Sequence, residues 1–181
     1  RNRLDLYILI FNQYQKKWLK MSFKIIDNYL SKENHLILTS VLEETNFPWF
    51  FCNKVIGGEP KNLFNMQFHH TFYNDDKVNS HFFNCIDPII KKLKPLSLIR
   101  VKANITPISH NLVKYETHVD QTFKCKVGIY YVNDNNGYTI IEGKKIKSKK
   151  NRMVLFTSDI EHYGTNSTDC RNRMVINFNY F

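Results

Sequence analysis

The sequence contains few of the residues that interrupt a chain. Glycine occurs 6 times and proline 5 times in 181 residues, and we find no internal repeat or low-complexity tract. These absences exclude a collagen-like or repetitive chain and argue against global disorder. A hydrophobic fraction of 43% and an aromatic fraction of 14% are instead typical of a globular domain.

The cysteines lack the spacing of a metal or redox motif. The sequence has four, and no two of them form a C-x-x-C pair: Cys52, Cys85, Cys125 and Cys170. The sequence therefore gives little support to a structural zinc site or a redox dithiol. Dispersed cysteines fit reduced thiols better than a disulfide framework, so we predict a cytoplasmic protein.

Long hydrophobic runs are also missing. No stretch approaches the roughly 20 apolar residues that a membrane-spanning helix needs, so we expect no membrane span. We interpret residues 1–20 as an N-terminal extension that forms an amphipathic helix. Residues 21–181 are long enough for one core and too few for two comfortable ones, so we predict a single domain.

Acidic residues are too few to balance the basic ones, and the formal net charge is +10. A basic surface favours anionic partners such as nucleic acid, acidic protein or an anionic membrane face. Much of the excess lies in residues 144–152, which we interpret as a hairpin with its solvated side outward. A nucleic-acid groove would interleave aromatic residues with the basic ones. This run has none, so nucleic acid is not the favoured partner.

The first half of the chain predicts helices with a few strands. Ser31 can cap a helix that ends before Asn46 and has apolar residues at helical spacing: Leu36, Ile37, Val41 and Leu42. Asp75 or Asp76 could begin a second helix that runs to Leu93. Pro88 must break or kink that helix, or lie in the first turn of a following one. The strands expected here are residues 23–26, 49–51 and 66–73.

The second half predicts short strands that are rich in β-branched and aromatic residues and are separated by turns. They are residues 96–105, 111–117, 124–133, 138–142, 151–157 and 173–181. Residues 134–137, Asp-Asn-Asn-Gly, predict a hairpin turn. Helices followed by many strands favour a mostly β fold with N-terminal helices (α+β). We predict a double-stranded β-helix, or jelly roll, with helices packed on one sheet.

The last strand has two different faces. Alternate residues point to opposite sides of a strand, so one face is apolar and carries Met174, Ile176, Phe178 and Tyr180. The opposite face carries Arg171, Arg173, Val175, Asn177 and Asn179. The polar face is either an ordinary solvent face or the lining of a pocket at the barrel mouth. In the second case the apolar face packs against the N-terminal helices.

Three residues have the chemistry of a mononuclear metal site. His118 and Asp120 share a face if they lie on a strand, and His162 would have to arrive from a distant strand or loop. Two imidazoles and one carboxylate suit ferrous iron and leave coordination positions open. We expect Glu161 to diverge from the site. His69 and His70 should point to opposite faces of a strand. We expect the remaining histidines to lie at the surface or in the core: His35, His81 and His110.

At these residues the chain resembles the 2-oxoglutarate/Fe(II)-dependent oxygenases. It is most similar to the prolyl-hydroxylase-like branch and to the small members of that branch that phages carry. The resemblance covers residues 115–181, and the N-terminal half matches more loosely. The matching segments are Tyr115–Asp120, Ile129–Asn133, Gly137–Thr139, Arg152–Phe156, His162 and Arg173–Phe181.

The resemblance implies that His118, Asp120 and His162 bind Fe(II). It implies that Arg173 pairs with the distal carboxylate of the co-substrate 2-oxoglutarate, a geometry that a guanidinium suits. Arg171 is the alternative, because its distance in sequence from His162 is common in the family. We prefer Arg173, because the strand that follows it matches the family strand in phase.

Further contacts to 2-oxoglutarate follow from the same resemblance. Tyr131 would hydrogen-bond the carboxylate that Arg173 holds, and Tyr115 would lie beside the co-substrate. Asn177 and Asn179 would line the pocket, where some relatives carry a hydroxyl residue and a tryptophan. Asn104 would be a further co-substrate contact, near a place where relatives commonly carry a tyrosine that this sequence lacks.

The implied activity is hydroxylation of a substrate C–H bond by dioxygen, coupled to decarboxylation of 2-oxoglutarate to succinate. Peptidyl proline is the leading substrate by analogy with the branch. The alternatives are a small-molecule or nucleic-acid oxygenase on the same scaffold, or a non-catalytic binding module related to cupins. The partner would then be a peptide or protein, or a small molecule. If the chain is phage-encoded, the location would be the cytoplasm of a bacterial host.

Overall fold

The computed structural model describes residues 22–55 and 64–181. The helix that we predict for residues 1–20 lies outside these residues. Within them the chain is mostly β-structure, with antiparallel sheets and few helices. None of these helices is both long and apolar enough to cross a membrane.

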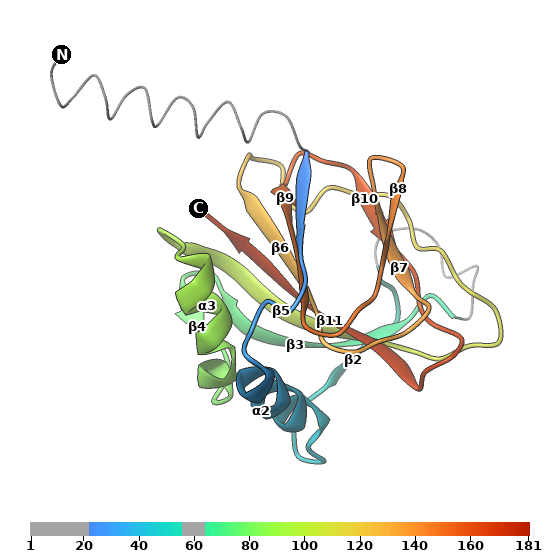
Figure 1. The fold of residues 1–181 in the computed structure, drawn as a ribbon, viewed down its shortest axis with the longest axis horizontal. Coiled ribbons are helices and arrows are strands. Elements are labelled where there is room, and N and C mark those ends of the chain that lie inside the picture. The colour runs from blue at the N-terminus through green and yellow to red at the C-terminus, as the bar shows by residue number, and fades with distance from the viewer. Residues whose placement is uncertain (1–21, 56–63) are drawn as a thin grey trace, which may run out of the picture.

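The larger sheet is eight-stranded and antiparallel, and it forms the middle layer of the molecule (Figure 1). β11 lies near its centre, between β6 and β5. It is the last strand of the chain, with one apolar and one polar face. The strands in spatial order are β1 (Phe23–Ile26), β9 (Arg152–Thr157), β6 (Lys126–Tyr131), β11 (Asn172–Tyr180), β5 (Leu98–Pro107), β3 (Gln67–Asn74) and β2 (Phe50–Cys52), with β4 (Lys77–Val78) paired to β3.

A smaller sheet covers part of one face of the larger one (Figure 1). It has three strands in the order β10 (His162–Gly164), β7 (Tyr138–Ile141) and β8 (Lys144–Lys147). An apolar cluster joins the two sheets: Val127, Ile129, Tyr131, Val154, Phe156 and Val175 from the larger sheet meet Ile141 and Ile146 from the smaller one. The two sheets therefore pack face to face, with a core between them.

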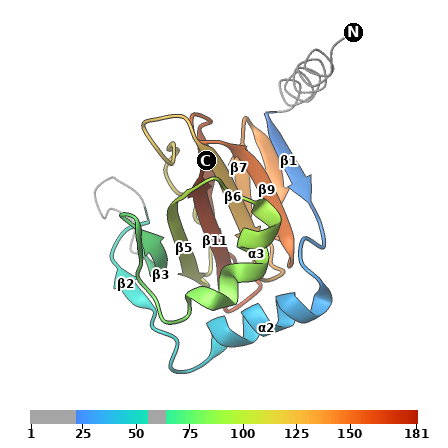
Figure 2. The same cartoon turned by 90° about the vertical axis from the view of Figure 1, so that its left-hand side faces the viewer.

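The helices cover the opposite face of the larger sheet (Figure 2). They are α2 (Lys32–Glu43), the 3₁₀ helix η1 (Phe83–Ile86) and α3 (Asp87–Leu93). α2 begins after Ser31, whose hydroxyl accepts a hydrogen bond from the Asn34 N–H at 3.2 Å. Its buried side carries Leu38 and Leu42. Two residues of the predicted apolar set are exposed instead, because they lie on the solvent side of the helix: Leu36 (55%) and Ile37 (54%).

The second predicted helix begins much later than expected. Asp75 and Asp76 have φ values of 52° and 57° and form the turn between β3 and β4. Aspartate tolerates this left-handed conformation better than most residues, so the two aspartates form the turn of a hairpin and do not cap a helix. Pro88 lies in the first turn of α3, where its missing N–H costs no hydrogen bond.

The predicted hairpin turn at residues 134–137 is wrong. β6 and β7 belong to different sheets, so this segment carries the chain from one sheet to the other. The hairpin of the smaller sheet instead joins β7 to β8 through Glu142 and Gly143, which have φ values of 48° and 73°. Both edges of β6 are already paired, with β9 and β11, so β6 has no free edge for β7.

The predicted strand at residues 111–117 is also wrong. Val113 and Tyr115 are buried, as an alternating pattern requires, but the segment makes only one isolated bridge, Lys114 to Thr165. The Asn166 side chain accepts the Val113 N–H at 2.7 Å. A side-chain bond therefore takes the place of a ladder bond, and the backbone here stays irregular.

The basic run is held partly by acidic residues. The Arg152 side chain donates to Asp27 at 2.6 Å and Lys149 donates to the same carboxylate at 2.9 Å. The Arg152 guanidinium, followed by the Lys149 ammonium, holds the pKa of Asp27 well below its usual range. Lys150 lies 3.7 Å from Asp134. These contacts give part of the run a structural role next to β1.

Candidate functional site

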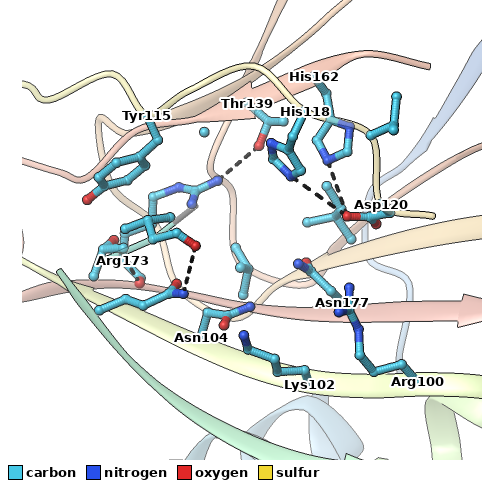
Figure 3. Close-up of a pocket in the computed structure, with 17 residues that line it drawn as sticks. Arg100, Lys102, Asn104, Tyr115, His118, Asp120, Thr139, His162, Arg173 and Asn177 are labelled. Carbon is cyan, nitrogen blue, oxygen red and sulfur yellow. Dashed lines mark hydrogen bonds and ion pairs between the residues drawn. The ribbon is translucent and has the colours of Figure 1, made fainter. Parts of the chain in front are cut away.

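A cavity of about 250 Å³ lies between the two sheets, open at one side. Its walls come from both sheets and from the irregular segment before β6. Figure 3 shows Arg173 and Tyr115 on one side of this pocket, and His118, His162 and Asp120 on another. The polar face of β11 forms part of the floor, with Val175 and Asn177. Of the two interpretations of that face, the structure favours the pocket over the solvent face.

The structure brings the three predicted metal ligands together. One ligand atom from each of His118, Asp120 and His162 lies within 4.8 Å of the others. Asp120 Oδ1 is 3.7 Å from Nε2 of both histidines. The two histidines form an isolated antiparallel bridge, with both N–H···O bonds at 3.0 Å. His118 and Asp120 therefore do not lie on a regular strand as expected, and the bridge to β10 fixes His118 instead.

The orientation of the imidazoles suits a metal ion. Nδ1 of His118 lies 3.2 Å from the Glu116 carbonyl oxygen, and Nδ1 of His162 lies 3.1 Å from that of Ile160. An Nδ1–H that donates to a carbonyl leaves the Nε2 lone pair free to bind metal, and both Nε2 atoms face Asp120. Burial, with the neighbouring His162, lowers the pKa of His118, which favours the neutral ligand form.

The spacing of these atoms fits one ion. Metal bonds to nitrogen and oxygen are about 2.1 Å long, so two ligands of one ion lie at most about 4.2 Å apart. The two 3.7 Å separations from Asp120 satisfy this limit, and the three ligand atoms all lie within 4.8 Å of one another, so binding one ion needs at most a small side-chain shift. Two histidines and one carboxylate on one side of an ion are the donor set of ferrous oxygenase sites. The residues present therefore fit Fe(II).

Asn179 is a hydrogen-bond partner of the Asp120 carboxylate. Its side-chain amide donates to Asp120 Oδ2 at 3.0 Å and is fully buried. It does not line the cavity as predicted, whereas Asn177 does. Asn179→Ala should weaken Mn(II) or Fe(II) binding by about 10- to 100-fold, because outer partners orient metal ligands. Anaerobic metal titration measures this effect. Wild-type metal affinity in the variant would refute the role.

Arg173 is a buried cation without an acidic partner among the described residues. Its side chain is almost enclosed, with 6% of the residue exposed. Its guanidinium donates to Ser148 Oγ and Thr139 Oγ1, both at 2.9 Å, and lies 5.5 Å from the Tyr131 ring centre. Burial lowers its pKa, and no carboxylate of residues 22–55 or 64–181 lies within 4 Å of it. A buried unpaired charge is costly, so the site suits an anionic ligand.

Tyr131 and Tyr115 take different positions around Arg173. The Tyr131 hydroxyl donates to Thr139 Oγ1 at 2.7 Å, and Tyr131 does not line the cavity as its predicted contact with 2-oxoglutarate would require. Tyr115 does line it, and burial raises its pKa to about 12, although the Arg173 charge acts in the opposite direction. Only Tyr115 is therefore placed to touch a ligand directly, as the structure stands.

Arg171 is not part of the pocket. It is exposed and precedes β11, although it shares the parity of Arg173. The strand begins at Asn172, so only Arg173 is carried under the smaller sheet, where Thr139 and Ser148 meet it.

Sequence reasoning missed several residues that line the cavity or hold Arg173. Thr139 and Ser148 hold Arg173, and a hydroxyl opposite a buried cation has no signature in the sequence. Arg100 and Lys102 line the cavity together with Asn104, which was predicted from the resemblance. A signal for these two cations existed, because residues 100, 102 and 104 alternate on β5 and must share a face.

The other histidines lie outside the metal group. His70 is buried and contacts the Pro48 carbonyl at 2.8 Å and Ser80 Oγ at 2.7 Å. His35 contacts the Tyr130 hydroxyl at 2.7 Å in the helix-side core. Glu161 is exposed, as expected for a side chain that diverges from His162.

Gly137 leaves space for Arg173. A Cβ at this position would lie 2.5 Å from the Asn166 carbonyl oxygen and 2.7 Å from Arg173 Cδ. Gly137→Ala should therefore lower the free energy of unfolding by about 1–3 kcal/mol and weaken binding of an anion at Arg173. Urea unfolding and 2-oxoglutarate titration measure the two effects.

Gly143→Ala is the matched control for Gly137→Ala. Its φ of 73° strains an alanine, but its Cβ would meet no atom within 4 Å. It should cost about 1–2 kcal/mol of stability and leave anion binding unchanged. Equal effects of both variants on anion binding would contradict the role of Gly137.

Comparison with solved structures identifies the fold. No protein-family model matches the sequence, and no curated protein matches it. A prolyl hydroxylase from Trichoplax adhaerens, solved with a fragment of the hypoxia inducible factor oxygen degradation domain, is similar over 99% of this chain and 94% of its own, with a TM-score of 0.60 and 14% identity. A 2OG-Fe(II) oxygenase family protein from Burkholderia pseudomallei has a TM-score of 0.66 at 6% identity, over 93% and 89%.

A third similar structure contains bound 2-oxoglutarate. HygX from Streptomyces hygroscopicus, solved with nickel and 2-oxoglutarate bound, has a TM-score of 0.59 and 12% identity over 99% of this chain and 87% of its own. These similarities extend over nearly the whole chain. The chain therefore has the fold of the 2-oxoglutarate- and Fe(II)-dependent oxygenases.

Proposed function

We propose that this chain is an Fe(II)- and 2-oxoglutarate-dependent dioxygenase with a single catalytic domain at residues 21–181. The observation that carries the proposal is the pairing of two sites in one cavity. One is the group of two histidines and an aspartate that fits ferrous iron. The other is buried Arg173, which has no acidic partner among the described residues. Both line the same cavity between the sheets. A binding module needs no such pair, so we favour an enzyme over a cupin-like module.

Each residue of the site has its own role in this proposal. His118, Asp120 and His162 would hold Fe(II), and Asn179 would hold the carboxylate in position. Arg173 would bind the distal carboxylate of 2-oxoglutarate, held by Thr139 and Ser148. When bound, Fe(II) with 2-oxoglutarate and dioxygen supplies the oxidation of a substrate C–H bond, coupled to release of succinate and carbon dioxide. The two sheets shelter that reaction from water.

The substrate has two candidates. Peptidyl proline is supported by the sequence resemblance and by the peptide-bound prolyl hydroxylase of the same fold. A small molecule is supported by the polar lining of the cavity, where buried side-chain atoms of Asn104 and Asn177 have no hydrogen-bond partner. The same fold occurs in an epimerase from nogalamycin biosynthesis, so it serves small molecules as well. Nucleic acid remains the less favoured alternative, and the proposed location is the cytoplasm.

The test is an anaerobic titration of Fe(II) and 2-oxoglutarate. Chelation of a 2-oxoacid by ferrous iron gives a visible charge-transfer band, so wild type should show this band and His118→Ala should not. On admission of air, wild type should convert 2-oxoglutarate to succinate. Folded wild type that binds iron but gives neither band nor succinate would refute the proposal and favour the binding module.

A further inference from the structure

Two cations in the cavity have no task in the proposed function. Arg100 and Lys102 lie on β5 and line the same cavity as His118 and Asp120. In the sheet register, Lys102 is opposite Asn177 and Arg100 is opposite Asn179, the residue that holds Asp120. Directly opposed residues of antiparallel strands are about 5 Å apart at Cβ. Figure 3 shows both cations below Asp120 and away from Arg173.

These cations differ from the basic residues that stabilise the fold. Lys149 and Arg152 share the carboxylate of Asp27, and Lys150 pairs with Asp134. Neither Arg100 nor Lys102 has a carboxylate within 4 Å among the described residues. Nε of Arg100 is buried and has no hydrogen-bond partner there. The two cations therefore lack the partners that a structural role would supply.

The charges of the loaded site would leave both cations uncompensated. Fe(II) with Asp120 carries one net positive charge, and Arg173 adds a second. The two carboxylates of 2-oxoglutarate neutralise these two charges, and Arg100 and Lys102 remain. Burial, followed by the Arg100 charge, lowers the pKa of Lys102. An anionic group between the two cations would relieve the repulsion of their charges.

Other buried polar atoms on the same side of the sheet also lack hydrogen-bond partners among the described residues. Buried side-chain atoms of His69, Asn104 and Asn177 have no hydrogen-bond partner, and Asn104 is paired in register with His69 on β3. Buried polar groups are normally satisfied, so these atoms mark a place where a ligand can form hydrogen bonds. The unpaired atoms of Asn104 and Asn177 are amide oxygens, so they would accept from a donor group of the ligand, while the two cations would hold its anionic group.

We propose that Arg100 and Lys102 form a second anion-binding subsite, and that the substrate is a small molecule with a carboxylate or phosphate close to the oxidised carbon. The proposal rests on the proposed function for the reaction, but the subsite itself does not depend on the metal. It replaces the neutral peptidyl proline as the substrate class, and it explains why β5 carries two cations on its pocket face.

The first experiment uses inorganic phosphate as the probe. Protein loaded with Mn(II) and saturating 2-oxoglutarate under argon is titrated with phosphate, and the ³¹P relaxation caused by bound Mn(II) is measured. Arg100→Gln should weaken phosphate binding by about 10- to 100-fold, because a half-buried charge partner is lost. Arg100→Lys should restore part of it. The matched control is Lys91→Gln, an exposed position on α3 that faces away from the cavity.

A metal-free arm separates this proposal from the proposed function. Phosphate binding is measured by calorimetry in Arg173→Gln protein, which lacks the first anion subsite, and in Arg173→Gln with Arg100→Gln. Binding in the single variant that disappears in the double variant supports the subsite, even if Mn(II) fails to bind. Equal binding in the two proteins, or equal binding in wild type and Arg100→Gln, would overturn it.

The second experiment identifies the anion. Matched pairs are incubated with Fe(II), 2-oxoglutarate and air: carboxylic acids with their carboxamides, phosphate monoesters with their alcohols, and a neutral prolyl peptide and an oligonucleotide. Gain of one oxygen is read by mass spectrometry. Oxidation of an acid but not of its neutral partner supports the proposal and names the anion. Oxidation of the prolyl peptide or the oligonucleotide at the same rate by wild type and Arg100→Gln would overturn it.

Discussion

Replacing Arg173 by glutamine should weaken 2-oxoglutarate binding by about 100-fold or more. Arg173 is buried, and its guanidinium meets only hydroxyl groups and the Tyr131 ring, so the ligand would be its sole anionic partner among the described residues. Removing one member of a buried charge pair costs about 2–5 kcal/mol. The measurement is the dissociation constant of 2-oxoglutarate under argon with Mn(II) bound.

Arg171→Gln is the matched control for this variant. It removes the same charge from an exposed position two residues earlier, so electrostatic attraction at long range is nearly equal in the two proteins. We expect its 2-oxoglutarate affinity to stay within about twofold of wild type, since exposed charges contribute little. Loss of affinity in Arg171→Gln with retention in Arg173→Gln would reverse our assignment of the co-substrate residue.

Loss of any one metal ligand should abolish stable metal binding. Asp120→Ala removes the only carboxylate of the group, and His162→Ala removes a buried imidazole at 3.7 Å from it. We expect each change to raise the Mn(II) dissociation constant by more than the about 10- to 100-fold that an outer partner contributes. Electron paramagnetic resonance of free Mn(II) measures the constant directly.

His110→Ala is the control for the metal variants, because His110 is exposed and lies outside the group. It should bind Mn(II) as wild type does. Circular dichroism should confirm that all variants stay folded. If Asp120→Ala binds Mn(II) with wild-type affinity, the three residues are not a metal site, and both the metal assignment and the proposed oxygenase fail.

The sequence alone predicted the features that depend on donor chemistry or on the two-residue period of a strand. The alternation in residues 173–180 placed Met174 and Ile176 on the helix side and Asn177 on the pocket side, and the structure agrees. The donor types of His118, Asp120 and His162 predicted a cluster that the structure brings within 4.8 Å, although His118 and Asp120 do not lie on a regular strand. Side-chain direction along a strand has a period of two, so it can be read without knowledge of the partner strands.

The sequence did not determine which segments pair. Residues 134–137 had the composition of a hairpin turn, yet β6 and β7 lie in different sheets. The pattern of residues 111–117 indicated a strand, but Asn166 supplies a hydrogen bond from its side chain. A turn residue or an alternating pattern is a local property. The partner of a strand depends on edges that distant segments leave free.

Only the tertiary structure showed that Arg173 is buried and Arg171 exposed, and that Arg100 and Lys102 line the pocket. The sequence determined the donor types, the polar face of the last strand and a mostly β architecture. It could not determine burial, because whether a cation is costly or harmless depends on how far the second sheet covers it. Burial of Arg173 beneath β7 and β8, with Thr139 and Ser148, is set by the contact of the two sheets.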